Sequence, residues 1–202
     1  MPKIQTPSIS WQPELPNAQL RYFQNFLSVE AANYYYKVFL KNIPWQQDNV
    51  KVYGKTYAQP RLTSLHSNTF ETYTYSGLTL KPHIMIPELL ELLNQIQVVS
   101  NHEYNSVLLN LYRDGADSNG WHADDEKELG TNPVIASISL GAERVFHLKH
   151  KNIKTLKHKL TLKNGSMLLM KGTTQHHWLH QIPKTKKPIG KRINLTFRFI
   201  NP

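Results

Sequence analysis

The sequence predicts an α+β protein whose core is a double-stranded β-helix, or jelly roll, buttressed by N-terminal helices. Two helix-like segments lie in the first half of the chain. Seven short strand-like segments follow from Ser106 onward, separated by turn signals such as Asp114-Gly115 and Asn164-Gly165. Many short strands with regular turns are typical of antiparallel sandwiches and barrels.

The first half of the chain is expected to hold both helices. Ser28 is a preferred N-cap residue, Pro44 would end the first helix, and Pro87 suits the first turn of the second. The expected elements are an extended arm over 1–18, a strand over 20–27, a helix over 28–43, a hairpin over 50–57 and a helix over 87–98. The residues expected on the two apolar helix faces are Val29, Ala32, Tyr36, Phe39 and Leu40 in the first, and Leu89, Leu90, Leu93 and Ile96 in the second.

The second half is expected to supply the sheets. The predicted strands cover 107–112, 134–140, 144–150, 156–162, 166–170, 178–182 and 193–200. We therefore expect one domain over 19–202 after the arm, with helices and hairpins over 19–105 and the strand core over 106–202.

Composition limits the classes of function. Lys and Arg number 24 against 14 for Asp and Glu, a formal charge of +10. This balance favours a polyanionic partner, nucleic acid first and an acidic membrane surface second. The absence of cysteine excludes disulfides, thiol catalysis and thiolate metal sites. No signal peptide or membrane-length apolar run is visible, so we expect an intracellular protein with no membrane partner. Its compartment would be the cytoplasm or, in a eukaryote, the nucleus. We also expect a monomer.

Two histidines and a carboxylate form a candidate metal site. His122 and Asp124 are two residues apart, so a strand or strand end would present both on one side. His180 is the candidate third ligand because it lies in a strand-like run, whereas His176 and His177 are expected at the surface or on the substrate side. This set is the facial triad of mononuclear iron(II) oxygenases. Zinc is the competing metal and would imply hydrolysis through an activated water.

Two arginines favour the oxygenase interpretation. Arg192 and Arg198 are six residues apart on a predicted strand, so both side chains should point to one face. Arg198 lies between Phe197 and Phe199, which predicts an inward side chain that needs an anionic partner. Guanidinium groups pair bidentately with carboxylates, which suits a dicarboxylate such as 2-oxoglutarate.

An ordered series of motifs resembles the AlkB-type Fe(II)/2-oxoglutarate-dependent dioxygenases, which oxidatively remove alkyl groups from nucleic-acid bases. The motifs are Pro60-Arg61, Tyr73-Thr74-Tyr75-Ser76-Gly77, Asn110-Leu111-Tyr112-Arg113-Asp114-Gly115, Trp121-His122-Ala123-Asp124-Asp125-Glu126, Ala136-Ser137-Ile138-Ser139-Leu140-Gly141, Trp178-Leu179-His180 and Arg192-Ile193-Asn194-Leu195-Thr196-Phe197-Arg198. The likeness is greatest to the small homologues that repair duplex or single-stranded DNA.

The resemblance implies iron(II), 2-oxoglutarate and O2 as cofactor and co-substrates, with His122, Asp124 and His180 binding the iron. It implies that Arg192 and Tyr112 bind the far carboxylate of 2-oxoglutarate. Arg198 and Asn110 would contact the carboxylate near the metal. Asn194 would share that lining.

The resemblance also implies a substrate side for a base that has left its stack. The residues expected there are Tyr73, Tyr75 and Ser76 beside the base, Asp125 and Glu126 toward a cationic lesion such as 1-methyladenine or 3-methylcytosine, Tyr53 as a wedge in the vacated stack, and Arg61 nearby. Tyr73 and Tyr75 can alternatively pack on a strand face, Tyr53 can be an ordinary hairpin aromatic, and the acidic pair can form a solvated turn.

Two basic stretches are open to two interpretations, phosphate contact or simple solvation. They are the loop 184–191 and the lysines Lys149, Lys151, Lys154, Lys157 and Lys159. The histidines among those lysines, His147, His150 and His158, are expected at solvated strand positions. DNA is the expected partner. An RNA demethylase, a non-catalytic basic nucleic-acid-binding module and a cupin-like isomerase or zinc hydrolase are the alternatives.

Overall fold

The computed structural model describes residues 7–52, 55–68, 73–75 and 78–201. In chain order its elements are β1 (Gln19–Phe23), α1 (Val29–Asn42), β2 (Asn49–Val52), β3 (Lys55–Ala58), β4 (Leu62–Ser67), β5 (Tyr73–Tyr75), β6 (Leu78–Leu80), β7 (His83–Ile84), α2 (Pro87–Ser100), β8 (Ser106–Tyr112), β9 (Asn119–His122), η1 (Lys127–Leu129), β10 (Ile135–Gly141), β11 (Arg144–His150), β12 (Lys157–Leu162), β13 (Ser166–Lys171), α3 (Thr174–His177), β14 (Trp178–Ile182) and β15 (Arg192–Arg198).

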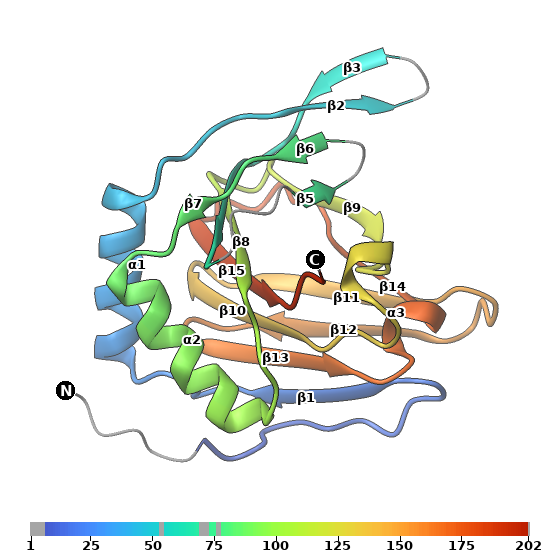
Figure 1. Ribbon diagram of the computed structural model, residues 1–202. Coiled ribbons are helices and arrows are strands. Elements are labelled where there is room, and N and C mark those ends of the chain that lie inside the picture. The colour runs from blue at the N-terminus through green and yellow to red at the C-terminus, as the bar shows by residue number, and fades with distance from the viewer. Residues whose placement is uncertain (1–6, 53–54, 69–72, 76–77, 202) are drawn as a thin grey trace.

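Two sheets form the core, as the jelly-roll prediction requires (Figure 1). The larger sheet has the strand order β1-β13-β10-β15-β8-β4-β7, and the smaller has the order β12-β11-β14-β9. Both are antiparallel except for the β4–β7 pair. Strands distant in sequence are therefore neighbours, and the predicted α+β jelly roll with N-terminal helices is confirmed.

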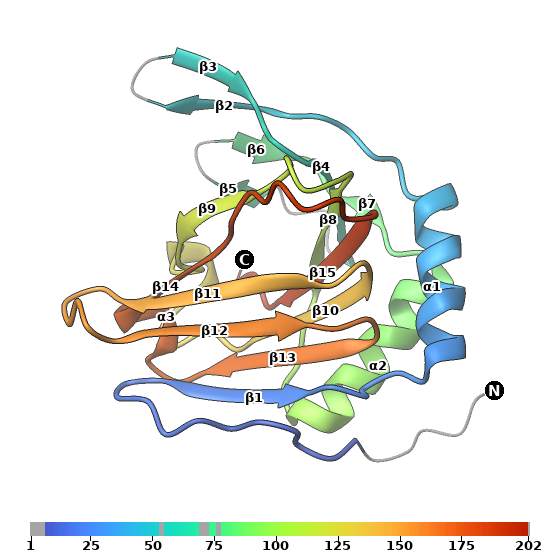
Figure 2. The ribbon, with the colours of Figure 1, turned by 180° about the vertical axis from the view of Figure 1, so that it is seen from behind.

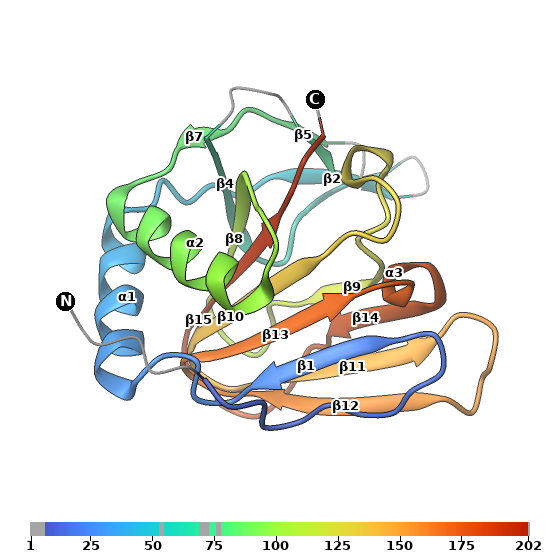
Figure 3. The same cartoon turned by 60° about the horizontal axis from the view of Figure 1, so that its bottom comes forward.

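Apolar side chains fill two layers on opposite faces of the large sheet. One layer joins that sheet to α1 and α2, which lie together against its outer face (Figures 1 and 3). The other layer fills the space between the two sheets and includes Phe146, Leu148 and Trp178. At roughly 25 cal/mol for each Å² of apolar surface removed from water, such burial is the main force that holds the layers together.

Strand alternation separates packing side chains from polar ones. In β15, Ile193, Leu195 and Phe197 pack toward the helices. Arg192 and Arg198, at the other positions of the same strand, are buried on the opposite face. The prediction that these two arginines share one face is therefore confirmed.

The caps of both helices follow the sequence signals. Ser28 accepts a hydrogen bond from the backbone N–H of Ala31 at 3.2 Å. Pro87 begins α2, and Asn101 ends it in the left-handed conformation. The predicted apolar faces were wrong in part. Val29 and Leu90 are exposed, while Tyr35 and Leu92 are buried in their places, because each helix is rotated relative to the expected face.

Some strand predictions also need correction. β1 ends at Phe23 and β15 at Arg198, both earlier than expected. The strands β4, β6, β7 and β9 were not predicted from the sequence. β4 is polar in sequence yet buried, because its polar groups are paired: the Ser64 hydroxyl lies 3.1 Å from the His66 ring, for example. The hairpin predicted over 50–57 is present as β2 and β3. The division into an arm over 1–18 and a single domain over 19–202 stays a prediction.

Gly141, which pairs with Arg192 across the sheet, adopts a backbone conformation that favours glycine. It has φ +83°, and a Cβ there would lie 2.6 Å from the carbonyl oxygen of Lys191. We expect Gly141→Ala to lower the free energy of unfolding by about 2 kcal/mol, because left-handed backbone strain and a backbone clash add. Chemical denaturation measures this. In Gly120→Ala an added Cβ meets nothing within 4 Å, so equal losses in the two variants would contradict the expectation.

Candidate active site

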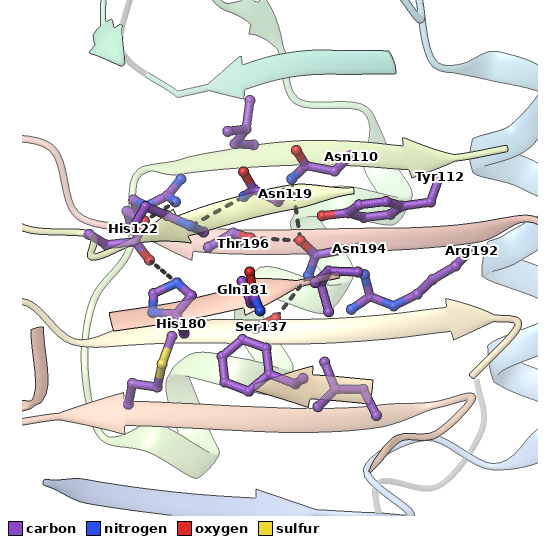
Figure 4. A pocket seen from close by; sticks show the side chains of 17 residues that line it. Asn110, Tyr112, Asn119, His122, Ser137, His180, Gln181, Arg192, Asn194 and Thr196 are labelled. Atoms are coloured by element: carbon purple, nitrogen blue, oxygen red, sulfur yellow. Dashed lines mark hydrogen bonds and ion pairs between the residues drawn. The ribbon is translucent and has the colours of Figure 1, made fainter. Parts of the chain in front are cut away.

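A pocket between the two sheets holds most of the polar residues singled out from the sequence (Figure 4). His122 and His180 lie at one end, and Tyr112 and Arg192 lie at the other. The wall between them includes Asn110 and other polar side chains. The pocket thus has a metal-type end and a cationic end.

The metal-type end consists of His122, Asp124 and His180, whose ligand atoms all lie within 4.8 Å of one another. Antiparallel pairing of β9 with β14 sets His122 directly opposite His180. The Nδ1 of His122 lies 2.7 Å from the carbonyl oxygen of Gly120, which can only accept a hydrogen bond. Nδ1 therefore carries the proton, and Nε2 keeps the lone pair that a metal needs.

Electrostatics give these three groups the protonation states that a metal requires. Burial alone would raise the pKa of Asp124, but Arg198 and the two histidines outweigh it and lower the pKa to about 2. Burial first, and then His122, lowers the pKa of His180 to about 3. Burial also lowers the pKa of His122. A charged carboxylate beside two neutral imidazoles is the donor set that suits iron(II).

Arg198 and Gln175 hold Asp124 in place. Arg198 donates from Nη2 to Oδ1 of Asp124 at 2.6 Å, and both side chains are buried. This is the anionic partner predicted for an inward Arg198. The Oε1 of Gln175, a residue that sequence reasoning missed, accepts a hydrogen bond from the Asp124 backbone N–H at 3.0 Å. No pattern in the sequence predicts that Gln175 contacts Asp124.

Side-chain amides form the wall of the pocket (Figure 4). The Asn110 Nδ2 donates to the Oδ1 of Asn194 at 3.2 Å, and the Asn194 Nδ2 donates to the Ser137 hydroxyl at 2.8 Å. Arg61 is buried and donates from Nε to the Oδ1 of Asn110 at 2.7 Å. Arg61 therefore supports this wall, and its predicted contact with the substrate stays a prediction.

The cationic end is Arg192, which is 1% exposed. Its Nη2 donates to the Ser139 hydroxyl at 2.9 Å, while its Nε and Nη1 have no hydrogen-bond partner. Its guanidinium carbon lies 5.2 Å from the centre of the Tyr112 ring. Burial lowers the pKa of Arg192 to about 10, so it stays charged at neutral pH. Two orphaned N–H groups on a buried cation fit a carboxylate that binds from the pocket.

The structure describes the predicted substrate side only in part. Asp125 is exposed and pairs with Lys151 at 2.9 Å. Glu126 is half-buried, and its Oε2 is buried without a hydrogen-bond partner. Burial and the charge of Asp124 raise the pKa of Glu126. Tyr53 and Ser76 lie outside the described residues, as do the side chains of Tyr73 and Tyr75, although the backbone of β5 pairs with β6.

One histidine prediction was wrong. His150 is buried, and its Nδ1 accepts hydrogen bonds from the backbone N–H groups of Asn152 and Ile153. It closes the turn after β11, which satisfies its polar atom away from water. His147 and His158 are half-buried, and His158 stacks on Trp11 with ring centres 4.9 Å apart.

Comparisons with known proteins agree with this geometry. Residues 19–198 match the model of the 2OG-Fe(II) oxygenase superfamily. The chain is 39% identical over 186 residues to "Alpha-ketoglutarate-dependent dioxygenase alkB homolog 3" of Bos taurus, and this alignment covers 88% of this chain and 64% of that protein. It is 40% identical over 158 residues to "DNA oxidative demethylase ALKBH2" of Homo sapiens, and this alignment covers 75% of this chain and 60% of that protein. The matched part thus spans less than two thirds of these relatives.

A solved structure is similar in fold. "The structure of OsALKBH1" aligns with a TM-score of 0.66 at 17% identity, covering 93% of this chain and 99% of that one. In the part of the chain that the structure describes, no helix is both long and apolar enough to span a membrane.

Proposed function

Because the chain belongs to the AlkB-type 2OG-Fe(II) oxygenases, we propose that it removes alkyl groups oxidatively from damaged DNA bases such as 1-methyladenine and 3-methylcytosine. This would be direct-reversal repair. The observation that carries the proposal is one buried pocket with an iron-type triad at one end and a partly unpaired arginine at the other. The names of the relatives support DNA as the substrate.

The residues of the pocket fit the cofactor and co-substrate of this family. We assign His122, Asp124 and His180 to iron(II). We assign Arg192 and Tyr112 to the far carboxylate of 2-oxoglutarate, with Asn110, Asn194 and Arg198 along its nearer end. When bound, iron(II) supplies the oxidation: O2 is consumed, 2-oxoglutarate becomes succinate and CO2, and the hydroxylated alkyl carbon leaves the base as an aldehyde.

The chain's own residues orient the reactants and exclude water. Arg198 keeps the Asp124 carboxylate charged and aimed, and the amide wall fixes Asn110 and Asn194. Phe146 stacks on the His180 ring with ring centres 5.2 Å apart and forms an apolar wall beside the metal ligand. Fixed groups in a dry pocket lower the cost of bringing co-substrate and base together.

The substrate side also fits a nucleic acid. The β2–β3 and β5–β6 hairpins and the turn between β11 and β12 all extend to the side of the molecule away from α1 and α2 (Figures 1 and 2). We propose that a base enters from this side and that, as the resemblance implies, Tyr73, Tyr75 and Ser76 bind the base while Tyr53 acts as a wedge in the vacated stack. The orphaned Oε2 of Glu126 can accept a hydrogen bond from the amino group of a cationic base, and the formal charge of +10 favours a polyphosphate.

Mass spectrometry of oligonucleotides that contain 1-methyladenine tests the proposal. Single-stranded DNA, duplex DNA and RNA of one sequence are incubated with the protein, iron(II), O2 and 2-oxoglutarate, with 2-oxoglutarate omitted as the control. We expect loss of the methyl group from DNA only when 2-oxoglutarate is present. Preferential loss from RNA would identify an RNA demethylase instead. Salt-dependent binding with neither methyl loss nor succinate would identify a non-catalytic binding module.

A further inference from the structure

Arg144 lies buried behind the cationic end of the pocket, and neither the metal nor the co-substrate assignment uses it. It is 3% exposed at the start of β11. Among the described residues, no carboxylate lies within ion-pair distance of its guanidinium. A buried charge is costly unless its hydrogen bonds are made, so the burial of Arg144 needs a physical explanation.

The hydrogen bonds of Arg144 join two loops. Nη1 donates to the carbonyl oxygen of Asp114 at 3.0 Å. Nη2 donates to those of Asp117 at 2.9 Å and Pro183 at 2.7 Å. The first two carbonyls belong to the loop after β8, and the third begins the loop before β15. The same loops also meet directly, where the Thr185 N–H donates to the carbonyl oxygen of Gly115 at 2.8 Å.

These loops flank the two residues assigned to the far carboxylate. Tyr112 is the last residue of β8 and Arg192 is the first of β15, and the two are directly paired across the sheet. The guanidinium carbons of Arg144 and Arg192 lie 5.5 Å and 5.2 Å from the centre of the Tyr112 ring. Contacts of this kind between a guanidinium and an aromatic face are attractive, so Arg144 holds the ring as well as the loops.

The two arginines also concentrate positive charge. Among the described residues, no carboxylate lies within ion-pair distance of Arg144 or Arg192, and both guanidinium groups lie against the Tyr112 ring. Burial is the main cause of the lowered pKa of Arg192, and the charge of Arg144 lowers it further. The charges of Asp117 and Asp114 partly offset that of Arg144, but neither aspartate lines the pocket. An anion that enters beside Arg192 is therefore favoured by the low-dielectric interior.

We propose that Arg144 is a positioning and specificity-determining residue, which fixes Tyr112 and Arg192 and adds the second positive charge that makes the pocket select a 2-oxo acid with a distal carboxylate. The inference rests on the proposed function, because it takes this pocket as the site of 2-oxoglutarate. It assigns to Arg144 a contribution to the choice of co-substrate without direct contact.

The test compares two 2-oxo acids in the full chain with Mn(II) in place of iron. Calorimetry measures the dissociation constants of 2-oxoglutarate and of 2-oxopentanoate, which has a methyl group where the distal carboxylate would be. In Arg144→Gln we expect 2-oxoglutarate to bind on the order of tenfold more weakly, the scale of effect when a supporting partner is removed. Binding of 2-oxopentanoate should change less than twofold, so the preference for the diacid falls.

Further variants separate charge from packing. Arg144→Lys keeps the charge but loses the forked geometry, so binding of 2-oxoglutarate should weaken less than in Arg144→Gln, and binding of 2-oxopentanoate should again change less than twofold. It also serves if Arg144→Gln does not fold. Arg113→Gln is the matched control, because Arg113 pairs with Asp117 in the same loop at 2.8 Å but its side chain is 40% exposed. An unchanged ratio in Arg144→Gln would overturn the inference. A wild-type protein that does not bind 2-oxoglutarate would instead overturn the proposed function.

Discussion

The Asp124→Ala variant is expected to show no 2-oxoglutarate-dependent turnover and to be less stable than the wild type even without metal. The two effects have separate causes. Removing the carboxylate takes one of three ligands from the metal site. It also removes the buried partner that Arg198 contacts at 2.6 Å, and breaking such a pair by removing one member typically costs about 3–5 kcal/mol.

A double variant separates these effects. Asp124→Leu with Arg198→Met replaces the buried pair with apolar side chains, which is often neutral for stability. We expect it to recover most of the free energy of unfolding of the metal-free wild type, measured by denaturation in the presence of a chelator. Calorimetric titration should still detect no tight Mn(II) binding. A double variant that regained turnover together with stability would contradict the assignment of Asp124 to the metal.

Some strands of the site could be predicted from the sequence. These are the strands in which apolar and polar residues alternate without interruption. β15 is the clearest case, because Ile193, Leu195 and Phe197 mark the packed face and thereby place Arg192 and Arg198 on the other. The alternation determines which face of the sheet each side chain occupies, and this is enough to place both arginines between the two sheets.

Contacts between distant segments could not be predicted in the same way. Arg198 and Asp124 are 74 residues apart, and no local pattern favours this pair over others. β9 was missed because it is four residues long and joins β14 through a shifted register. Arg61 and Gln175 act through hydrogen bonds to other residues of the site, and Arg144 through hydrogen bonds to the loops beside it. Their roles therefore depend on packing that only the folded chain defines.

The Arg192→Met variant is expected to be more stable than the wild type without co-substrate and far weaker in binding 2-oxoglutarate. The wild-type guanidinium is buried and two of its nitrogens, Nε and Nη1, have no hydrogen-bond partner; each unsatisfied buried group costs about 1–3 kcal/mol. Methionine is unbranched and apolar and can fill the same space without that cost. Loss of the cation should weaken binding of 2-oxoglutarate by about 2–5 kcal/mol, the scale for truncating one member of a buried charged pair.

The two effects have opposite signs, so one thermal denaturation experiment detects both. A ligand at 100 times its dissociation constant stabilises the folded state by about 2.7 kcal/mol. At that concentration of 2-oxoglutarate, with Mn(II) present throughout, the wild type should gain this amount and Arg192→Met should gain less than about 1 kcal/mol. The stability advantage of the variant should therefore shrink or reverse. Arg21→Met is the control, because Arg21 is exposed on β1 and its loss changes the net charge equally.

The outcome for Arg192 decides whether its unpaired atoms serve the co-substrate. A residue whose buried N–H groups are unmatched in the empty pocket destabilises the fold there, and natural proteins retain such residues where binding requires them. If Arg192→Met were stabilised but gained as much from 2-oxoglutarate as the wild type, the distal carboxylate would have to bind elsewhere. If the variant were destabilised without ligand, the hydrogen bond to Ser139 and the contact with Tyr112 would outweigh the two orphaned N–H groups.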